Sequence, residues 1–151
     1  MNKLLDISLK TEAGVLIFSP VGVHKSEGVF DFNIVCALAK RFSGFLPGSF
    51  TCRLYRSDIE RLVSYFDSHV RGLMVGELKE SPPYVPLEGD MQIKCLDGDV
   101  VDLSDGYFSI SVLFNCGKAG ELSSNTYFGL ETVVDLTDLN EFCEGLKILI
   151  L

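Results

Sequence analysis

Two histidines and five cysteines are the residues of this 151-residue chain whose types could support nucleophilic or metal chemistry. We interpret His24, in a stretch interrupted by glycine and proline, as a solvated loop residue. His69 lies in the last turn of a predicted helix, where the helix dipole favours a cation. Neither the serine-hydrolase motif G-x-S-x-G nor the metalloprotease motif H-E-x-x-H occurs. We therefore expect no catalytic residue, and we do not expect the chain to be an enzyme.

The spacing of the cysteines gives no metal site. Successive cysteines lie 16, 43, 21 and 27 residues apart, so no two form the closely spaced pair of a structural zinc site. Cys36 and Cys52 fall in phase with the apolar residues around them, which is typical of cysteines that act as small core side chains. We expect reduced thiols, no metal and no cofactor.

A cluster of acids offers a second kind of chemistry, the recognition of cations. Six acids occur within 18 residues, with Lys94 as the only base among them: Glu88, Asp90, Asp97, Asp99, Asp102 and Asp105. An EF-hand calcium loop needs an acid at position five and glycine at position six, where this chain has Val101 and Asp102. Three interpretations stay open: solvent-exposed acids of hairpin loops, an irregular weak cation site, and an anionic surface that docks a basic protein.

The charge of the whole chain is distributed unevenly. Residues 1–87 carry nine acids and ten bases, whereas residues 88–151 carry twelve acids and three bases, which together give the net charge of −8. A negative potential repels nucleic acid and anionic lipid, and it accelerates association with cationic proteins. We therefore expect no nucleic-acid partner and no membrane partner. The alternative is that the excess of acids serves only solubility.

Length and composition indicate one folded domain over residues 1–151. The chain is 47% hydrophobic and 23% charged, which is ordinary for a globular protein with its own core. Asp6 interrupts the start of the chain before any apolar run of signal-peptide length, and no apolar stretch is long enough to cross a bilayer. These features favour a cytoplasmic protein.

Alternation of apolar and polar residues at period two predicts short strands. They are expected over residues 5–9, 15–18, 30–38, 50–54, 91–95, 100–103, 107–116 and 127–134. Asp97-Gly98 is a typical two-residue hairpin turn between two of them. Loops are expected over 20–28 and over the glycine- and serine-rich stretch 117–125, and 72–90 is expected to be an irregular crossing connection.

Two helices are expected to cover the strands. Ser57 with Glu60 forms the pattern of a capping box, an apolar stripe runs from Ile59 to Val70, and Gly72 is the expected stop. The second helix covers residues 136–149, capped by Asp135 or Thr137. Short connections between strands require mainly antiparallel pairing. The predicted fold is α+β: a mainly antiparallel sheet of about eight strands, curved or sandwich-like, with two covering helices.

The order of these elements resembles a known family. The residues that carry the likeness are Arg56–Leu62 at the start of a helix, Pro86–Ile93 leading into a strand, the alternating strand Tyr107–Asn115, Phe128–Glu131, and the closing helix Leu136–Leu149. This arrangement is similar to the WapI-like immunity proteins of bacterial polymorphic or contact-dependent toxin systems, from about Phe30 onward. The resemblance implies a cytoplasmic, non-enzymatic protein that binds one toxin domain and blocks it, and it transfers no functional residue.

We therefore expect an immunity-type protein that neutralises a cognate, basic toxin by stoichiometric binding. The expected contact is the acidic segment Glu88 to Asp105, followed by the acids of 131–144. The alternative is a β-sandwich or half-barrel module that binds a small ligand in a concave apolar face.

Overall fold

The computed structural model describes residues 4–77, 79–118 and 124–151. Its strands are β1 (Ile7–Thr11), β2 (Gly14–His24), β3 (Val29–Leu38), β4 (Ser49–Tyr55), β5 (Met91–Asp102), β6 (Asp105–Asn115) and β7 (Tyr127–Asp135). Its helices are α1 (Arg56–Met74) and α2 (Leu136–Leu149), with short 3-10 turns η1 (Lys25–Glu27) and η2 (Lys40–Phe42). Residues 119–123 of the loop predicted over 117–125 lie outside the described residues.

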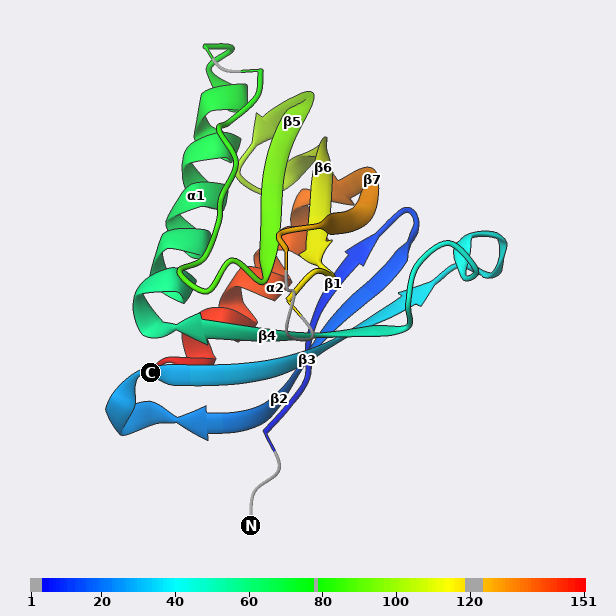
Figure 1. The fold of residues 1–151 in the computed structure, drawn as a ribbon. Coiled ribbons are helices and arrows are strands. Elements are labelled where there is room, and N and C mark those ends of the chain that lie inside the picture. The colour runs from blue at the N-terminus through cyan, green and yellow to red at the C-terminus, as the bar shows by residue number, and fades with distance from the viewer. Residues whose placement is uncertain (1–3, 78, 119–123) are drawn as a thin grey trace.

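The strands form two antiparallel sheets in which neighbours in sequence are neighbours in space. Strands β1 to β4 make one sheet and β5 to β7 make the other, with α1 linking the two (Figure 1). Because each connection within a sheet is short, antiparallel pairing is the geometry available to it. The predicted α+β fold, mainly antiparallel with two helices, is confirmed.

The described residues form seven strands rather than eight, because the turn expected at Asp97-Gly98 does not occur. These residues lie inside β5, where the register against β6 shifts between Cys95 and Gly98. A Cβ at Gly98 would lie 2.1 Å from the carbonyl oxygen of Tyr107, so the glycine permits close strand approach at a bulge. The chain turns instead at Leu103 and Ser104. There the Asp102 carboxylate accepts the Ser104 N–H at 2.8 Å.

The loop expected over 20–28 is also largely strand. Strand β2 continues to His24, with a register shift against β3 between Pro20 and Gly22. A bulge is where a strand tolerates proline, since proline has no N–H to donate. The turn itself is confined to η1 and to Gly28, whose φ of 66° is the left-handed conformation that glycine adopts readily.

Both helices pack on the same apolar side of the sheets, and one core serves the whole fold. The buried residues of every strand and of both helices belong to a single apolar cluster. Phe142 of α2 makes edge-to-face contacts with Phe18 of β2 and with Phe66 of α1, with ring centroids 5.2 and 6.3 Å apart. Seven phenylalanines are fully buried in this core: Phe18, Phe30, Phe32, Phe66, Phe108, Phe114 and Phe142.

The ends of α1 differ from the expected ones, whereas α2 begins and ends as predicted. At the start of α1 the N-cap is Tyr55 rather than Ser57, and the Asp58 carboxylate, in the role expected of Glu60, accepts the Tyr55 N–H at 2.9 Å. The helix continues two residues past Gly72, to Met74, which buries Leu73, and Gly76 with φ of 73° follows it. At α2, Asp135 caps the helix by accepting the Thr137 N–H at 2.8 Å.

The buried Asp58 carboxylate also holds the connection between α1 and β5. It accepts the Leu87 N–H at 3.1 Å and pairs with Arg61 at 2.9 Å. The Tyr84 hydroxyl donates to the Asp58 backbone carbonyl at 2.7 Å, and Tyr84 forms a bridge with Ile93 of β5. The irregular connection predicted over 72–90 is therefore anchored to the helix on one side and to β5 on the other.

His69 is the clearest departure from sequence expectation, because its side chain is fully buried rather than placed as a cation at a helix end. Its Nε2 lies 2.8 Å from the Leu96 carbonyl oxygen and its Nδ1 lies 2.7 Å from Ser81 Oγ. The carbonyl can only accept, so Nε2 carries the proton and the Ser81 hydroxyl donates to Nδ1. Burial lowers the pKa of His69, so the ring is neutral at pH 7.

This burial predicts a pH-dependent stability. Because the pKa of His69 is lowered in the folded chain, the unfolded chain binds more protons as the pH falls below about 6.5. The free energy of unfolding should therefore decrease from pH 7 towards pH 5, with a contribution from His69 of at most about 1.4 kcal/mol per pH unit. Urea titrations at several pH values should show a smaller slope for His69→Gln. The matched change His24→Gln removes the exposed histidine instead and serves as the reference for the effect of losing a histidine side chain. An unchanged slope in His69→Gln would show that His69 is not the titrating group.

Candidate functional site

The six acids predicted to bind a partner fall into two groups at opposite ends of β5. Glu88 and Asp90 precede the strand, whereas Asp97, Asp99, Asp102 and Asp105 lie in its distal part and in the turn to β6. A strand rises about 3.3 Å per residue, so roughly 23 Å separate Asp90 from Asp97, the nearest members of the two groups along the chain. The acids therefore do not form one continuous surface.

Glu88 and Asp90 are engaged in contacts within the fold. The Asp90 carboxylate accepts the backbone N–H of Arg53 and the ammonium of Lys118, both at 2.8 Å. Glu88 accepts the Tyr55 hydroxyl at 2.7 Å, and its backbone carbonyl accepts a second hydrogen bond from Lys118. The hydrogen bond to Asp90 raises the pKa of Lys118, so the cation is retained. This group ties β4 to the start of β5, and its negative charge is partly neutralised.

The four distal acids are all exposed, and they differ in what they bind. Asp97 accepts the Gly98 N–H, and Asp102 accepts both the N–H and the hydroxyl of Ser104. These hydrogen bonds shape the bulge and the turn, and the N–H of Ser104 lowers the pKa of Asp102. Asp99 and Asp105 have no ion pair or side-chain hydrogen bond with any described residue. Their charge is available to a partner.

A tyrosine lies between carboxylates on this hairpin. Tyr107 of β6 is paired with Asp99 of β5 on one side and with Asp135 of β7 on the other. Directly opposite residues of antiparallel strands have Cβ atoms about 4.5–5.5 Å apart, so the three side chains form one row. Tyr107 is 51% exposed. The sequence places Asp99 and Asp135 36 positions apart, so only the strand register reveals this row.

Two exposed apolar side chains lie in the same hairpin as this row, and a hydrogen bond from α2 holds the hairpin in place. Val101 and Leu103 are 67% and 43% exposed at the tip of the hairpin. The side-chain amide of Asn140 in α2 donates to the Leu103 carbonyl at 3.1 Å. We call the exposed residues Asp99, Val101, Leu103, Asp105, Tyr107 and Asp135 the hairpin surface. An aromatic ring between carboxylates can receive a lysine or arginine through cation–π and ionic contacts.

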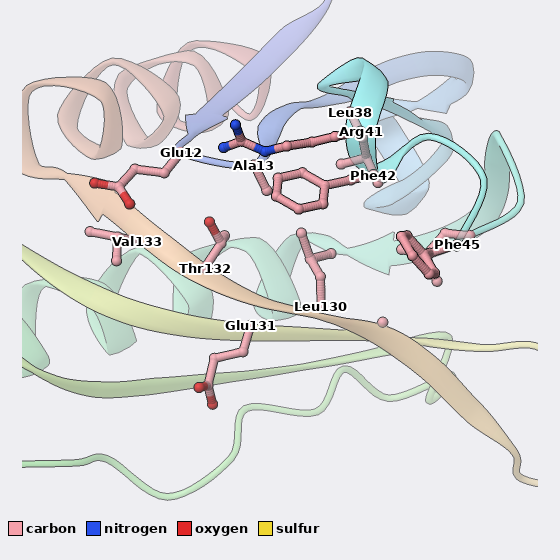
Figure 2. Close-up of a pocket in the computed structure, with 12 residues that line it drawn as sticks. Glu12, Ala13, Leu38, Arg41, Phe42, Phe45, Leu130, Glu131, Thr132 and Val133 are labelled. Carbon is pink, nitrogen blue, oxygen red and sulfur yellow. The ribbon is translucent and has the colours of Figure 1, made fainter.

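A groove of about 430 Å³ lies on the other side of β7, towards the β1–β2 turn (Figure 2). Five consecutive residues of β7, from Gly129 to Val133, form one wall, and the segment around η2 forms the other. Leu130 and Thr132 point into the groove towards Phe42, whereas the Glu131 side chain points away. Arg41 lies over the Phe42 ring at 4.7 Å, close to Glu12. No pattern in the sequence singled out this groove.

The four buried or half-buried thiols, Cys36, Cys52, Cys95 and Cys143, are poorly suited to nucleophilic chemistry. Burial raises the pKa of Cys36 and of Cys143 to about 11, and it raises the pKa values of Cys52 and Cys95 further. Such thiols are protonated at neutral pH, which disfavours both nucleophilic attack and metal binding. Over residues 4–77, 79–118 and 124–151, no three His, Cys, Asp or Glu side chains are grouped to hold a metal ion.

Comparison with protein-family models, curated proteins and solved structures finds no match to this chain. Within the described parts of the chain, neither helix has the combination of length and apolar character needed to cross a bilayer.

The division of the acids predicts different effects of mutation. Asp90→Ala should lower the free energy of unfolding by about 1–3 kcal/mol, because it removes the acceptor of the Arg53 N–H and of Lys118. Asp105→Ala should leave the stability nearly unchanged, because its carboxylate binds no described residue. Urea denaturation of the two variants tests this, and equal destabilisation would contradict the assignment of Asp90 to the fold and Asp105 to the surface.

Proposed function

We propose that this chain is an immunity-type protein that binds a basic toxin domain stoichiometrically and blocks it. The observation that carries the proposal is the exposed Tyr107 between Asp99 and Asp135, with Asp99 free of any described partner. Carboxylates on both sides of an exposed ring complement a lysine or arginine of the partner. The proposed contact surface is the hairpin surface. Of the acidic segment predicted from the sequence, Glu88 to Asp105, it keeps Asp99 and Asp105.

The composition of the hairpin surface supports protein binding over simple solvation. Loop acids that serve only solubility need no apolar neighbours, yet Val101 and Leu103 are exposed in the same hairpin as these acids. Interfaces combine a tyrosine or other anchor with apolar contacts and a polar rim. Pairing with β7 and the hydrogen bond from Asn140 hold the surface in one conformation before binding. A preorganised surface loses less conformational entropy on association.

The charge of the chain supports a basic partner. Residues 88–151 carry the excess of acids, and within the described residues Glu88 and Asp90 are the members of the predicted segment that pair with a cation of the fold, Lys118. The remaining negative potential accelerates encounter with a basic protein and repels nucleic acid and anionic lipid. Toxin domains that act on nucleic acid are often basic, and an acidic inhibitor competes for the surface that binds phosphate. We place this function in the cytoplasm, without catalysis or cofactor.

One observation favours the alternative function, the binding of a small ligand. The groove beside β7 is within the 300–1,000 Å³ range of small-molecule sites and is lined mainly by apolar side chains. A small ligand would raise the melting temperature in the absence of any protein partner. The toxin-binding proposal instead requires a 1:1 complex with a protein.

The proposal predicts a strong effect of charge reversal at the two unpartnered acids. The partner to test is the product of the adjacent upstream gene, co-expressed with this chain and purified as a 1:1 complex that also restores growth. Asp99→Lys with Asp105→Lys should lower the association rate at low salt by about tenfold and flatten its dependence on salt. The expected change is larger at low salt because counterions screen exposed charges. Surface plasmon resonance at several salt concentrations measures both quantities.

A second double variant distinguishes a specific contact at the hairpin surface from a general effect of net charge on the association rate. Glu27→Lys with Glu60→Lys changes the net charge equally, at exposed acids of η1 and α1 that lie outside the hairpin surface. This control should change the rate by less than about threefold. Equal effects of the two double variants, or an unchanged rate and salt slope in the hairpin variant, would rule out the hairpin surface.

A further inference from the structure

The two sheets approach each other where the turn after β1 meets β7, and we call this contact the seam. The backbone N–H of Glu12, just after β1, donates to the carbonyl oxygen of Val133 in β7 at 3.0 Å. It is the only backbone hydrogen bond between β1 or its turn and β7 in the described parts of the chain. Beyond it the chain turns at Ala13 and runs back as β2, so β7 has no neighbouring strand on this side from Gly129 to Thr132.

The direction of this hydrogen bond shows which main-chain groups are left at the edge. In an antiparallel ladder, alternate residues direct both their N–H and their C=O to the same side of the strand. The Val133 carbonyl faces the seam, so Glu131 and Gly129 also direct their main-chain groups there, while Leu130 and Thr132 face β6. No described backbone group is hydrogen-bonded to Glu131 or Gly129 at this edge. These two residues offer two donors and two acceptors with the spacing of a strand.

The groove runs along this free edge. Its β7 wall consists of the same residues, Gly129 to Val133, and its far wall includes Leu38, Phe42 and Leu46. Leu130 and Thr132 point into it across from Phe42 (Figure 2). Phe45, at the open end, is 80% exposed. The site therefore combines unused main-chain groups with an apolar lining on one side of the strand.

We infer that the free edge of β7 binds an extended peptide segment of a partner protein, which adds to the sheet as a further strand. Main-chain hydrogen bonds to Gly129 and Glu131 hold its backbone, and alternate apolar side chains enter the groove beside Leu130 and Phe42. A small apolar ligand would fill the groove but leave these main-chain groups unused. Exposed edges with unpaired N–H and C=O groups are ready templates for such pairing.

Charge specifies the residue of the peptide that lies opposite Glu131. Side chains alternate along a strand, so the residue paired with Glu131 has its side chain on the outer face, beside this carboxylate. A lysine or arginine complements Glu131 there. Arg41 lies at the Glu12 end of the groove, on the side that receives the apolar side chains. The preferred segment is therefore apolar–basic–apolar. This site does not depend on the hairpin surface, which begins at Asp135 on the other side of the seam.

Amide exchange measured by NMR tests the inference on the intact chain. The probe is a capped seven-residue peptide, Thr-Val-Lys-Val-Lys-Val-Thr, at about 1 mM, a concentration that saturates a site of micromolar affinity. The amides of Gly129 and Glu131 should exchange at least about tenfold more slowly with the peptide. Those of Leu130 and Thr132 should change much less, because β6 already binds them.

Three matched changes sharpen the test. N-methylation of one alternate set of peptide amides should abolish binding, and methylation of the other set should not, since only one set faces β7. Glu131→Lys should weaken the lysine peptide about threefold and favour the same peptide with glutamate in place of lysine. Phe42→Ala should weaken both peptides.

Several results would overturn the inference. They are unchanged exchange of Gly129 and Glu131 at 1 mM peptide, equal effects of the two methylated peptides, and occupation of the groove by octanoate but not by peptide. The last result would instead favour a small-ligand site. Because neither Asp99 nor Asp105 is altered, failure here is distinguishable from failure of the hairpin surface.

Discussion

The hydrogen bond from Glu12 to Val133 is the constraint from which the rest of the arrangement follows. Two short twisted sheets are covered on one side by the same pair of helices, so they share a core without sharing a ladder. Their edge strands approach at one point and then separate. The hairpin surface lies on one side of that point and the groove on the other. Both candidate binding regions border the place where the two sheets do not join into one continuous sheet along β1 and β7.

The negative charge of the chain serves two physical purposes. Where carboxylates have partners, as at Asp90 and Asp58, they join segments that no strand pairing connects. Where they lack partners, as at Asp99, they create an exposed potential next to an aromatic ring. Composition cannot separate these purposes, because both kinds of acid contribute equally to the net charge of −8. The two kinds of acid are distinguished by whether a backbone N–H or the Lys118 ammonium lies within hydrogen-bond distance of the carboxylate.

Much of the fold could be predicted because local patterns decide it. Alternation along residues 107–116 and the cap at Asp135 identify β6 and α2 without knowledge of their neighbours. The errors arise where a distant segment decides the outcome. Asp97-Gly98 is a bulge because Tyr107 lies against it, and His69 is buried because Ser81 and Leu96 satisfy its ring. The row of Asp99, Tyr107 and Asp135 and the free edge of β7 depend on register, which one-dimensional periodicity does not contain.

Hydrogen exchange of the purified complex shows whether a protein partner binds the hairpin surface. Mass-spectrometric exchange should compare this chain alone with the chain bound to the adjacent-gene product. We expect protection to be concentrated in the segments 97–107 and 135–140, while the amides of α1 between Glu60 and Arg71 exchange as in the free chain. Protection confined to α1, or to the outer face of β2 and β3, would contradict this expectation.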